Sequence, residues 1–507
     1  MGDKRKILEL GDLAERVRAL KLGGKVVVQC HGVFDLLHVG HIRHFQEAKS
    51  LGDVLVVTLT EDAHVNKGPH RPAFPDTLRA EQIAALDAVD FVAINRGPTA
   101  VPAIDAIAPD VYVKGQDYRR SGDDESGGIL IEREAVERGG GRIEFTDDIT
   151  FSSSTLVNRY LPSFSGEVEA YLEDFRRHYS ARDVIDAIKS LESLRVVVVG
   201  EAIIDEYVYC EQMGKSAKEP VLAMRYTSRE LFAGGSLAVA NHAANFCKGV
   251  DLVTYLGDRD NYQSFIGERL HDNVRLHAVV KSNSPTIVKR RYVESYLLSK
   301  LFEVYEINDE LLLPSESEAL CDTLGTLLGD TDGVIVADFG HGLMTEAGIE
   351  LLARDAPFLA VNTQINAANI GFHAISNYPR CDYVCIHEGE VRLDARSRRG
   401  ELKQLAARLA ERMSASSVLV TRGKRGATLF SKEADYSCPA FSTSVVDRIG
   451  SGDAVLAITS LCVRAGVDPK ITAFVANVIG AQKVKIMGNR TAIDRLATIK
   501  TVESLLK

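Results

Sequence analysis

The chain has 507 residues, of which 45% are hydrophobic and 26% charged, and its formal net charge is −10. This length exceeds what one hydrophobic core normally serves, so we expect two or more domains. This excess of acidic over basic residues argues against binding to nucleic acid and against binding to an anionic membrane surface. No apolar run reaches the roughly eighteen residues that a membrane span needs, and the N-terminus is unlike a signal peptide, so we expect a cytoplasmic protein.

The first elements alternate between strand and helix. Residues 6–21 carry apolar side chains at helical spacing, which predicts a leading amphipathic helix within residues 1–24. The apolar run at 25–29 is typical of a buried parallel strand, and 55–59 is a second one. Apolar residues at helical spacing lie between the two strands, so this stretch predicts strand, turn, helix and strand.

Two histidines stand at the predicted start of that helix. His38 and His41 lie three residues apart, where unpaired N–H groups and the helix dipole favour an anion. Two imidazoles there can share the charge that builds on a triphosphate as pyrophosphate leaves, and Gly40 lets a nucleotide approach the backbone. A lone histidine is more often a core or capping residue, but His-x-Gly-His after a strand, with Gly32 and Asp35 in the turn, favours nucleotide chemistry.

The stretch from His31 to Asp53 resembles the signature of the nucleotidyltransferase superfamily that includes glycerol-phosphate cytidylyltransferases and heptose-phosphate adenylyltransferases. The resemblance implies that His38 and His41 act in catalysis without a protein nucleophile, because the substrate phosphate attacks directly. The residues that we assign to the nucleotide site in this stretch are Gly32, Phe34, Asp35 and Gly40.

Lys67 and Arg71 lie in a loop at 64–74 that glycine and proline interrupt, before a predicted helix at 76–86. An ammonium and a bidentate guanidinium are the groups that phosphoryl oxygens select, although the loop alone fits solvated surface charge equally well. The superfamily resembled here has a lysine and an arginine at these places, which favours phosphate binding.

Strands predicted at 91–94 and 111–113, with a helix around 100–107 between them, continue the alternation. We therefore expect a doubly wound parallel sheet that binds ligands at the carboxyl ends of its strands. Lys114 follows such a strand and is a further phosphate-binding candidate. The stretch 122–128 fits a loop over the site or a surface excursion.

Ser153, Ser154 and Thr155 open a predicted helix after a last strand at 143–145. Hydroxyl groups at a helix start cap the helix or bind phosphate, and capping is the commoner use. The run resembles the Ser/Thr-rich segment with which the superfamily closes on nucleotide phosphates, so we assign both roles to these three residues.

We place the nucleotidyltransferase domain at 25–160, a linker and helix at 161–194, and a second α/β domain at 195–507. The second domain opens with a buried strand and a glycine turn, followed by Asp205. Gly234 and Gly235 precede a helix of small residues, where a polar ligand can approach closely, although a plain turn is the commoner explanation of such a pair.

Three segments of the second domain, 221–226, 287–293 and 301–306, alternate polar and apolar residues with period two. This pattern predicts a small antiparallel sheet laid over a site. Strand and helix alternation then resumes downstream and ends in the motif at 450–453.

Gly450, Ser451 and Gly452 precede Asp453 at the head of an apolar helix. Small residues let consecutive N–H groups point at a transferred phosphoryl group, and the adjacent carboxylate can accept a hydroxyl proton. The alternative role for Asp453 is that of a helix cap.

From about residue 195 onward the chain resembles the ribokinase-like sugar kinases of the PfkB type. The resemblance rests on Gly234-Gly235, on Asp447-x-x-Gly-Ser-Gly-Asp453, and on the run VTRGKRGA that contains Gly423. It implies a kinase fold with a β lid that commonly dimerises, MgATP as phosphoryl donor, Asp205 and the paired glycines at the sugar, and Gly423 at the nucleotide.

Both domains together are similar to the bifunctional heptose-phosphate kinase/adenylyltransferases, with the order of the two halves reversed. Two positions depart from that family. His387 replaces the asparagine of an Asn-x-x-Glu motif, whose glutamate, Glu390, can organise a Mg²⁺-bound water. Ala238 replaces an asparagine that the family tends to supply to the sugar.

The sequence thus predicts a two-step sugar-activation enzyme with no nucleic-acid or membrane partner, and we expect it to assemble as a homo-oligomer, a dimer. One domain transfers phosphate from ATP to a sugar or sugar phosphate, and the other couples a sugar 1-phosphate to ATP or CTP. One alternative is a working transferase whose degenerate kinase domain senses a sugar or dimerises. Another is the same pair of reactions on an alditol or another sugar with CTP.

Overall fold

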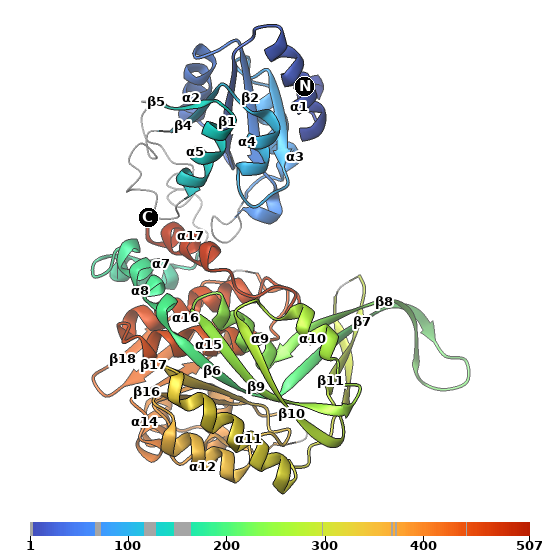
Figure 1. Ribbon diagram of the computed structural model, residues 1–507, viewed down its shortest axis with the longest axis vertical. Coiled ribbons are helices and arrows are strands. Elements are labelled where there is room, and N and C mark those ends of the chain that lie inside the picture. The colour runs from blue at the N-terminus through green and yellow to red at the C-terminus, as the bar shows by residue number, and fades with distance from the viewer. Residues whose placement is uncertain are drawn as a thin grey trace. The chain divides into compact units, whose positions relative to one another are not determined.

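The computed structural model describes residues 4–65, 72–115, 128–146, 164–296, 298–366, 369–370, 373–442 and 444–507. The chain divides into two compact units (Figure 1). The first unit is Met1–Ser165 with Ile499–Lys507, and the second is Gly166–Thr498. In the described residues no helix is both long and apolar enough to cross a membrane.

The first unit is built on a five-stranded sheet in the order β3-β2-β1-β4-β5. All four strand pairs are parallel. The strands are β1 (Val27–Gly32), β2 (Val54–Thr60), β3 (Phe91–Asn95), β4 (Val111–Gly115) and β5 (Arg142–Thr146). The helices are α1 (Leu10–Leu22), α2 (Val39–Ser50), α3 (Asp76–Ala84), α4 (Val101–Ile107) and α5 (Gly128–Arg138). The strand order reverses between β1 and β4, and such a switch point is where open parallel sheets bind ligands.

Helices cover both faces of this sheet, which confirms the doubly wound prediction. Phe45 of α2 and Ile83 of α3 pack into one cluster with strand residues. Leu13 and Val17 of α1 pack with Ile107 of α4 in a second cluster. Because both faces are buried, the strands are almost uniformly apolar rather than alternating.

The leading helix starts later than the predicted residue 6. Ile7 forms a parallel bridge with Val92, and the N–H of Leu8 donates to the Val92 carbonyl at 3.0 Å. These contacts extend the chain along the edge strand β3, so α1 begins only at Leu10. Helical spacing alone could not reveal this, because the competing partner lies more than eighty residues away.

The second unit is built on a nine-stranded sheet in the order β10-β9-β6-β13-β14-β15-β16-β17-β18. Its strands are β6 (Arg195–Gly200), β9 (Gly249–Arg259), β10 (Val274–Pro285), β13 (Gly333–Asp338), β14 (Leu359–Thr363), β15 (Tyr383–His387), β16 (Ser417–Thr421), β17 (Ala427–Ser431) and β18 (Asp435–Cys438). Neighbours are parallel from β10 to β16, and the last two pairs are antiparallel.

Helices lie on both faces of the large sheet, with α9, α15 and α16 on one face and α11, α12 and α14 on the other (Figure 1). In chain order, the α-helices between Gly166 and Lys483 are α7 (Gly166–Arg176), α8 (Ala181–Ser190), α9 (Ser236–Ala244), α10 (Gln263–Arg269), α11 (Pro314–Leu327), α12 (Glu346–Asp355), α13 (Glu388–Asp394), α14 (Leu402–Met413), α15 (Ser451–Arg464) and α16 (Pro469–Lys483). The chain ends in α17 (Arg495–Leu506).

A separate four-stranded sheet, which we call the lid, has the order β12-β11-β7-β8. Its strands are β7 (Ala202–Lys215), β8 (Leu222–Gly235), β11 (Ile287–Glu294) and β12 (Lys300–Glu306). The prediction of a purely antiparallel sheet is wrong for one pair, because β11 runs parallel to β7. Strands β6 and β10 end at the same edge of the large sheet, so their continuations β7 and β11 leave it in the same direction. Asp205 lies within β7, after the glycine that ends β6.

Candidate active sites

The paired histidines of the first unit stand where the sequence predicts, at the start of α2. His38 is the N-cap residue, and its Nδ1 accepts the N–H of Gly40 at 3.1 Å. Burial lowers the pKa of His38, so the ring is neutral at pH 7 and carries its proton on Nε2. Among the described residues, this Nε2 has no hydrogen-bond partner. It therefore offers one N–H donor beside the helix N-terminus.

His41 lies one turn further along α2 and faces His38. The two imidazole centroids are 4.0 Å apart. The rings of Phe34 and His41 form a T-shaped pair, with centroids 5.5 Å apart. Phe34 has a left-handed φ of 48°, and a Cβ on Gly32 would lie 3.0 Å from its ring. Glycine at 32 therefore lets Phe34 fold back and support the histidine pair.

A buried arginine holds the loop between β1 and α2. Arg79 of α3 is fully buried, and its guanidinium donates to the carbonyls of Val33 and Thr60 at 2.5 and 2.9 Å. It also pairs with Asp62 at 2.6 Å. The buried carboxylate of Asp35 accepts two N–H groups of residues 73 and 74. Asp35, predicted at the nucleotide, is thus placed as an anchor of this loop.

Lys114 lies at the carboxyl end of β4, beside the switch point. Its ammonium is 2.8 Å from a carboxylate oxygen of Glu132, to which the Tyr112 hydroxyl also donates at 3.1 Å. Burial lowers the pKa of His31 to about 3 and that of His44 to about 4, and the charge of Lys114 adds to both shifts. The structure brings these basic groups together at one end of the sheet, and phosphate binding by Lys114 stays a prediction.

Five predicted phosphate ligands lie outside the described residues. They are Lys67, Arg71, Ser153, Ser154 and Thr155. The start of the helix predicted to open with these three hydroxyl residues lies there too, as does most of the predicted loop at 122–128.

In the second unit, Asp453 lies in the first turn of α15, behind the N-cap residue Gly450. Gly450 has a φ of 75°, and a Cβ there would lie 2.4 Å from the amide oxygen of Asn489. Desolvation of the carboxyl raises the pKa of Asp453 to about 6, and the charge of Asp205 adds to the rise. The N–H groups of a first helical turn lack partners within the helix. With Ser451 and Gly452, this turn joins an anion-binding N-terminus to a carboxylate that can take up a proton near neutral pH.

Asp205 of the lid strand β7 pairs with the buried guanidinium of Arg291 in β11. A Cβ on Gly234 would lie 2.1 Å from a carboxylate oxygen of Asp205, so only glycine fits there. Gly235 is the N-cap residue of α9 and has a φ of 57°. The structure thus brings the three predicted sugar-site residues together, with Arg291 as a fourth member that the sequence did not single out.

The neighbouring Lys289 of β11 is buried, and its ammonium lies 5.3 Å from the Tyr305 ring centroid and 5.7 Å from that of Phe339. Burial lowers the pKa of Lys289, while the charges of Asp205 and Asp453 oppose this shift. Lys289 and Arg291 therefore present two positive charges from one strand of the lid. Their spacing of two residues places both on one face of β11, which is a signal that the sequence contains.

Glu390 belongs to the first turn of α13 and serves as its cap. One carboxylate oxygen accepts the N–H of His387 at 2.9 Å and the other accepts the N–H of Ile365 at 3.1 Å. Burial raises the pKa of Glu390. Glu388, the first residue of the same helix, pairs with Arg422 at 3.2 Å and with Arg425. These ion pairs tie α13 to the turn at Gly423, whose φ is 57°.

A buried polar network shapes the turn after β13. The carboxylate of Glu201, which follows β6, accepts the N–H groups of Phe339 and His341, both at 2.9 Å, and that of Leu343 at 3.4 Å. Burial raises the pKa of Glu201 to about 7, and the charge of Asp338 adds to the rise. This one carboxylate therefore fixes the backbone of residues 339–343 at the carboxyl end of the large sheet.

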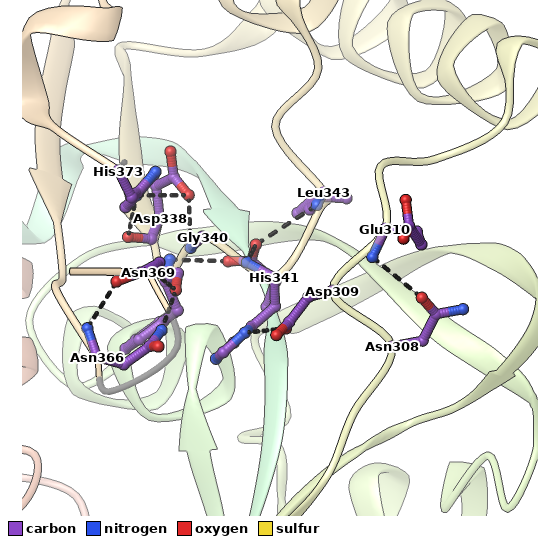
Figure 2. A network of polar contacts seen from close by, with 12 residues as sticks. Asn308, Asp309, Glu310, Asp338, Gly340, His341, Leu343, Asn366, Asn369 and His373 are labelled. Carbon is purple, nitrogen blue, oxygen red and sulfur yellow. Dashed lines mark hydrogen bonds and ion pairs between the residues drawn. The ribbon is translucent and has the colours of Figure 1, made fainter. Parts of the chain in front are cut away.

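The same network reaches the segment that follows the lid. Figure 2 shows His341 directed at Asp309, and the two side chains are 2.7 Å apart. The buried ammonium of Lys281 donates to the carbonyls of Asn308 at 2.6 Å and of Glu310 at 2.5 Å. The end of β12 is therefore anchored to the large sheet on the side where Asp205 and Asp453 lie.

Two parts of the chain match models of known protein families. Residues 193–495, more than half of the chain, match the family model described as pfkB family carbohydrate kinase. The chain belongs to the pfkB family of carbohydrate kinases. Residues 30–159 of this pfkB-family chain match a second model, described as cytidylyltransferase-like. Both resemblances are confirmed: the chain carries a pfkB carbohydrate kinase domain and a cytidylyltransferase-like domain, whereas the predicted boundaries at 25–160, 161–194 and 195–507 stay predictions.

The similar curated proteins align with only part of this pfkB-family chain. The bifunctional protein HldE of Citrifermentans bemidjiense is 40% identical over 162 residues, which cover 31% of this chain and 32% of that protein. The bifunctional protein HldE of Geobacter metallireducens is 39% identical over 165 residues, which cover 32% of each. The chain thus spans about a third of the length of these curated relatives.

Among solved structures, phosphofructokinase-2 from Escherichia coli in complex with potassium aligns with a TM-score of 0.51 at 15% identity. The alignment covers 62% of this chain and 100% of that one. The same enzyme in complex with substrates and products also has a TM-score of 0.51, at 13% identity. This likeness shows that the second unit has the fold of these kinases.

Proposed function

We propose that this pfkB-family chain is a two-site sugar-activation enzyme. Its kinase domain phosphorylates a sugar or sugar phosphate, such as a heptose 7-phosphate, at the expense of ATP. Its first domain then couples a sugar 1-phosphate to ATP or CTP and releases pyrophosphate. A separate phosphatase would act between the two steps. We place the enzyme in the cytoplasm, where nucleoside triphosphates are available.

The observation that carries the kinase proposal is the position of Asp453. This carboxylate stands at the N-terminus of α15 and interacts electrostatically with Asp205, whose side chain the lid contributes. A sugar held by Asp205 and the Gly234 turn would present a hydroxyl to Asp453, which takes its proton. The N–H groups at 450–452 would stabilise the charge on the transferred phosphoryl group.

Mg²⁺ is the metal that this kinase proposal requires, and the residues present fit it. Mg²⁺ in such sites is held mainly by substrate phosphates and water, with one or two carboxylates. Within the described residues no group of three or more His, Cys, Asp or Glu side chains could hold a metal ion. Glu390 would bind Mg²⁺ through water, and the bound ion would neutralise phosphate charge.

The transferase proposal rests on the histidine pair. The N–H at Nε2 of His38 and the ring of His41 stand at the N-terminus of α2, beside the switch point of the sheet. Donors placed there stabilise negative charge as it develops on the triphosphate. The substrate's own phosphate is the nucleophile, so the site needs no covalent intermediate.

A working transferase with a degenerate, sugar-sensing or dimerising kinase domain is the second candidate. His387 and Ala238 favour it, because both depart from the family pattern. The intact motif from Gly450 to Asp453 favours an active kinase. A third candidate keeps both activities on an alditol or another sugar, with CTP.

One experiment separates these candidates. The full chain is incubated with a panel of sugars, sugar phosphates and sugar 1-phosphates and with each labelled triphosphate, and ADP and pyrophosphate are measured separately. Formation of both ADP and pyrophosphate identifies the two-site enzyme. Pyrophosphate alone identifies the sensing module, and a CTP-specific reaction with an alditol phosphate identifies the third candidate.

We also propose that two copies associate through the lid. Its outer face holds a groove of about 580 Å³ lined in part by Met224, Tyr226, Tyr292 and Phe302. Tyr226 is 59% exposed and Phe302 54%. Apolar side chains on such a face suit a second copy of the same sheet. Replacing both Tyr226 and Phe302 by Asp should convert dimers to monomers in sedimentation velocity, and dimers that persist would exclude this surface.

A further inference from the structure

Lys483, the last residue of α16, is fully buried. Its ammonium donates to the carbonyl oxygens of Ile449 at 2.8 Å and of Gly488 at 2.6 Å. Both acceptors are neutral, so these hydrogen bonds do not compensate the positive charge. A buried ammonium is costly unless opposite charge lies near it, which directs attention to the carboxylates around Lys483.

The two carbonyls belong to segments that meet behind the start of α15. Ile449 directly precedes Gly450, and a Cβ on Gly450 would lie 3.2 Å from Cε of Lys483. The N–H of Gly488 donates to Asp447 at 2.9 Å, and Asp447 also accepts the N–H of Ile449 at 3.1 Å. Lys483 therefore fixes the position of the turn at 447–450 against the segment at 488–489.

Charged groups approach Lys483 from four other elements. Three carboxylates act on its ammonium: Asp453 on α15, Asp447 ahead of that helix, and Asp205 on β7. Lys300 of β12 is a nearby cation, which pairs with Asp447 at 2.5 Å. His242 of α9 also faces Lys483, but burial holds the pKa of that imidazole at about 3, so it is neutral. Arg291 pairs with Asp205, so three carboxylates face three cations here, Lys483 itself among them.

We propose that Lys483 is a positioning residue of the kinase, an internal cation that holds the phosphate-binding turn at 450–452 in shape and supplies positive charge beside Asp453. This inference rests on the proposed kinase function of the site. The two hydrogen bonds set the backbone ahead of α15, so they set the direction of the N–H groups in its first turn.

The positive charge has a second effect, on the proton acceptor itself. Lys483 and Lys289 both lower the pKa of Asp453, whereas burial, Asp205 and Glu390 raise it. Removing Lys483 should therefore raise that pKa further. A base acts only above its pKa, so the acid limb of the kinase pH profile should move to higher pH.

The test compares Lys483→Met with Lys485→Met, which removes the same charge from the same region but leaves both carbonyls untouched. Lys483→Met should lower kcat for ADP formation about 10²-fold, as does the loss of other groups that stabilise transition-state charge. The KM for the sugar should stay within about twofold, because Asp205 and Gly234 are unchanged. Lys485→Met should behave like wild type.

Chemical rescue distinguishes an electrostatic role from packing. Lys483→Ala leaves the two carbonyl oxygens and nearby carboxylates, which can hold a small cation. Ammonium chloride should then raise the rate of ADP formation by this variant at least tenfold, whereas tetramethylammonium chloride at equal ionic strength should leave the rate unchanged. Failure of rescue, together with an unshifted acid limb, would overturn the proposal.

Two further outcomes are decisive. If Lys483→Met, Lys483→Ala and Lys483→Gln all unfold while Lys483→Arg folds, the residue serves the fold and the inference is wrong. If wild type forms no ADP with any acceptor, the proposed kinase function fails by itself. Calorimetric binding of a non-hydrolysable ATP analogue then tests the inference separately, since Lys483→Met should weaken binding at least tenfold and unchanged affinity would overturn it.

Discussion

Asp453 shows how one carboxyl can serve catalysis at a cost to stability. Its pKa of about 6 in the folded protein lies above the ordinary value of an aspartate. The charged form, which accepts a proton, is therefore the form that folding disfavours. Stability from this group is present at low pH and is lost as the pH rises through about 6.

Asp453→Asn should consequently have two opposite effects. Asparagine keeps the size and one hydrogen bond but cannot accept the proton, so ADP formation should fall ~10²–10⁴-fold. The variant should also unfold at a higher temperature than wild type at pH 8 and at nearly the same temperature at pH 4. Kinetic assays and calorimetry at both pH values check this, with the exposed Asp272→Asn as control. Normal ADP formation in the variant would remove Asp453 from the mechanism.

The pH profile of the wild-type kinase gives an independent measure of the same group. Because the carboxylate is the active form, kcat/KM for ADP formation should decline on the acid side with an apparent pKa near 6. This decline on the acid side should be absent from the residual activity of Asp453→Asn. A limb near pH 4, the ordinary range of an aspartate, would show that the carboxyl is solvated in the working enzyme.

His41→Ala tests the role of a single residue in the transferase site. The imidazole should matter in the transition state, where charge builds on the triphosphate, and little in the ground state. Pyrophosphate formation should drop at least ~10²-fold while the circular dichroism spectrum and melting temperature stay close to wild type. The exposed His178→Ala is the matched control. A variant that keeps a third or more of the wild-type rate would exclude His41 from the mechanism.

At the scale of elements, Arg79 links α3 to the loop that shapes the nucleotide site. Arg79→Ala removes hydrogen bonds to three backbone carbonyls and one carboxylate, which should cost about 2–4 kcal/mol in the free energy of unfolding of the first unit. Transferase activity should fall with it, and Arg79→Lys should recover only part of both. Arg138→Ala, which breaks an exposed ion pair, should change stability by less than about 1 kcal/mol. Urea denaturation provides the measurement, and an unchanged midpoint for Arg79→Ala would contradict the role of this anchor.

Local patterns in the sequence were enough to predict most elements, and the chemistry assigned to their ends stays a prediction. The strands from β1 to β5, the glycine turn before α9 and the motif at α15 are encoded within short stretches. Contacts between distant residues were not predictable in this way. Arg291 meets Asp205 across 86 positions, and the parallel pairing of β11 with β7 depends on how the large sheet directs both strands. Lys483 looks like an ordinary helix-terminal lysine until the fold buries it.

At the scale of the whole molecule, the two units carry separate sets of functional groups. His38, His41 and Lys114 all lie in the first unit, whereas Asp205, Glu390 and Asp453 all lie in the second. The first set stands at a helix start and a strand end, and the second set stands at two helix starts and in the lid strand β7. Neither proposed reaction draws a residue from the other unit, so the chemistry of each is expected to survive the loss of the other.

Asp453→Asn and His41→Ala, each in the full chain, test this independence. Asp453→Asn should stop ADP formation with a sugar or sugar phosphate and leave pyrophosphate formation from a supplied sugar 1-phosphate within about twofold of wild type, since the transferase needs no proton acceptor from the kinase site. His41→Ala should show the reverse. Both reactions are measured on the same preparations, with the double variant as the inactive reference. If either single substitution silences both reactions in a folded protein, the two sites are coupled, and the picture of independent units must be abandoned.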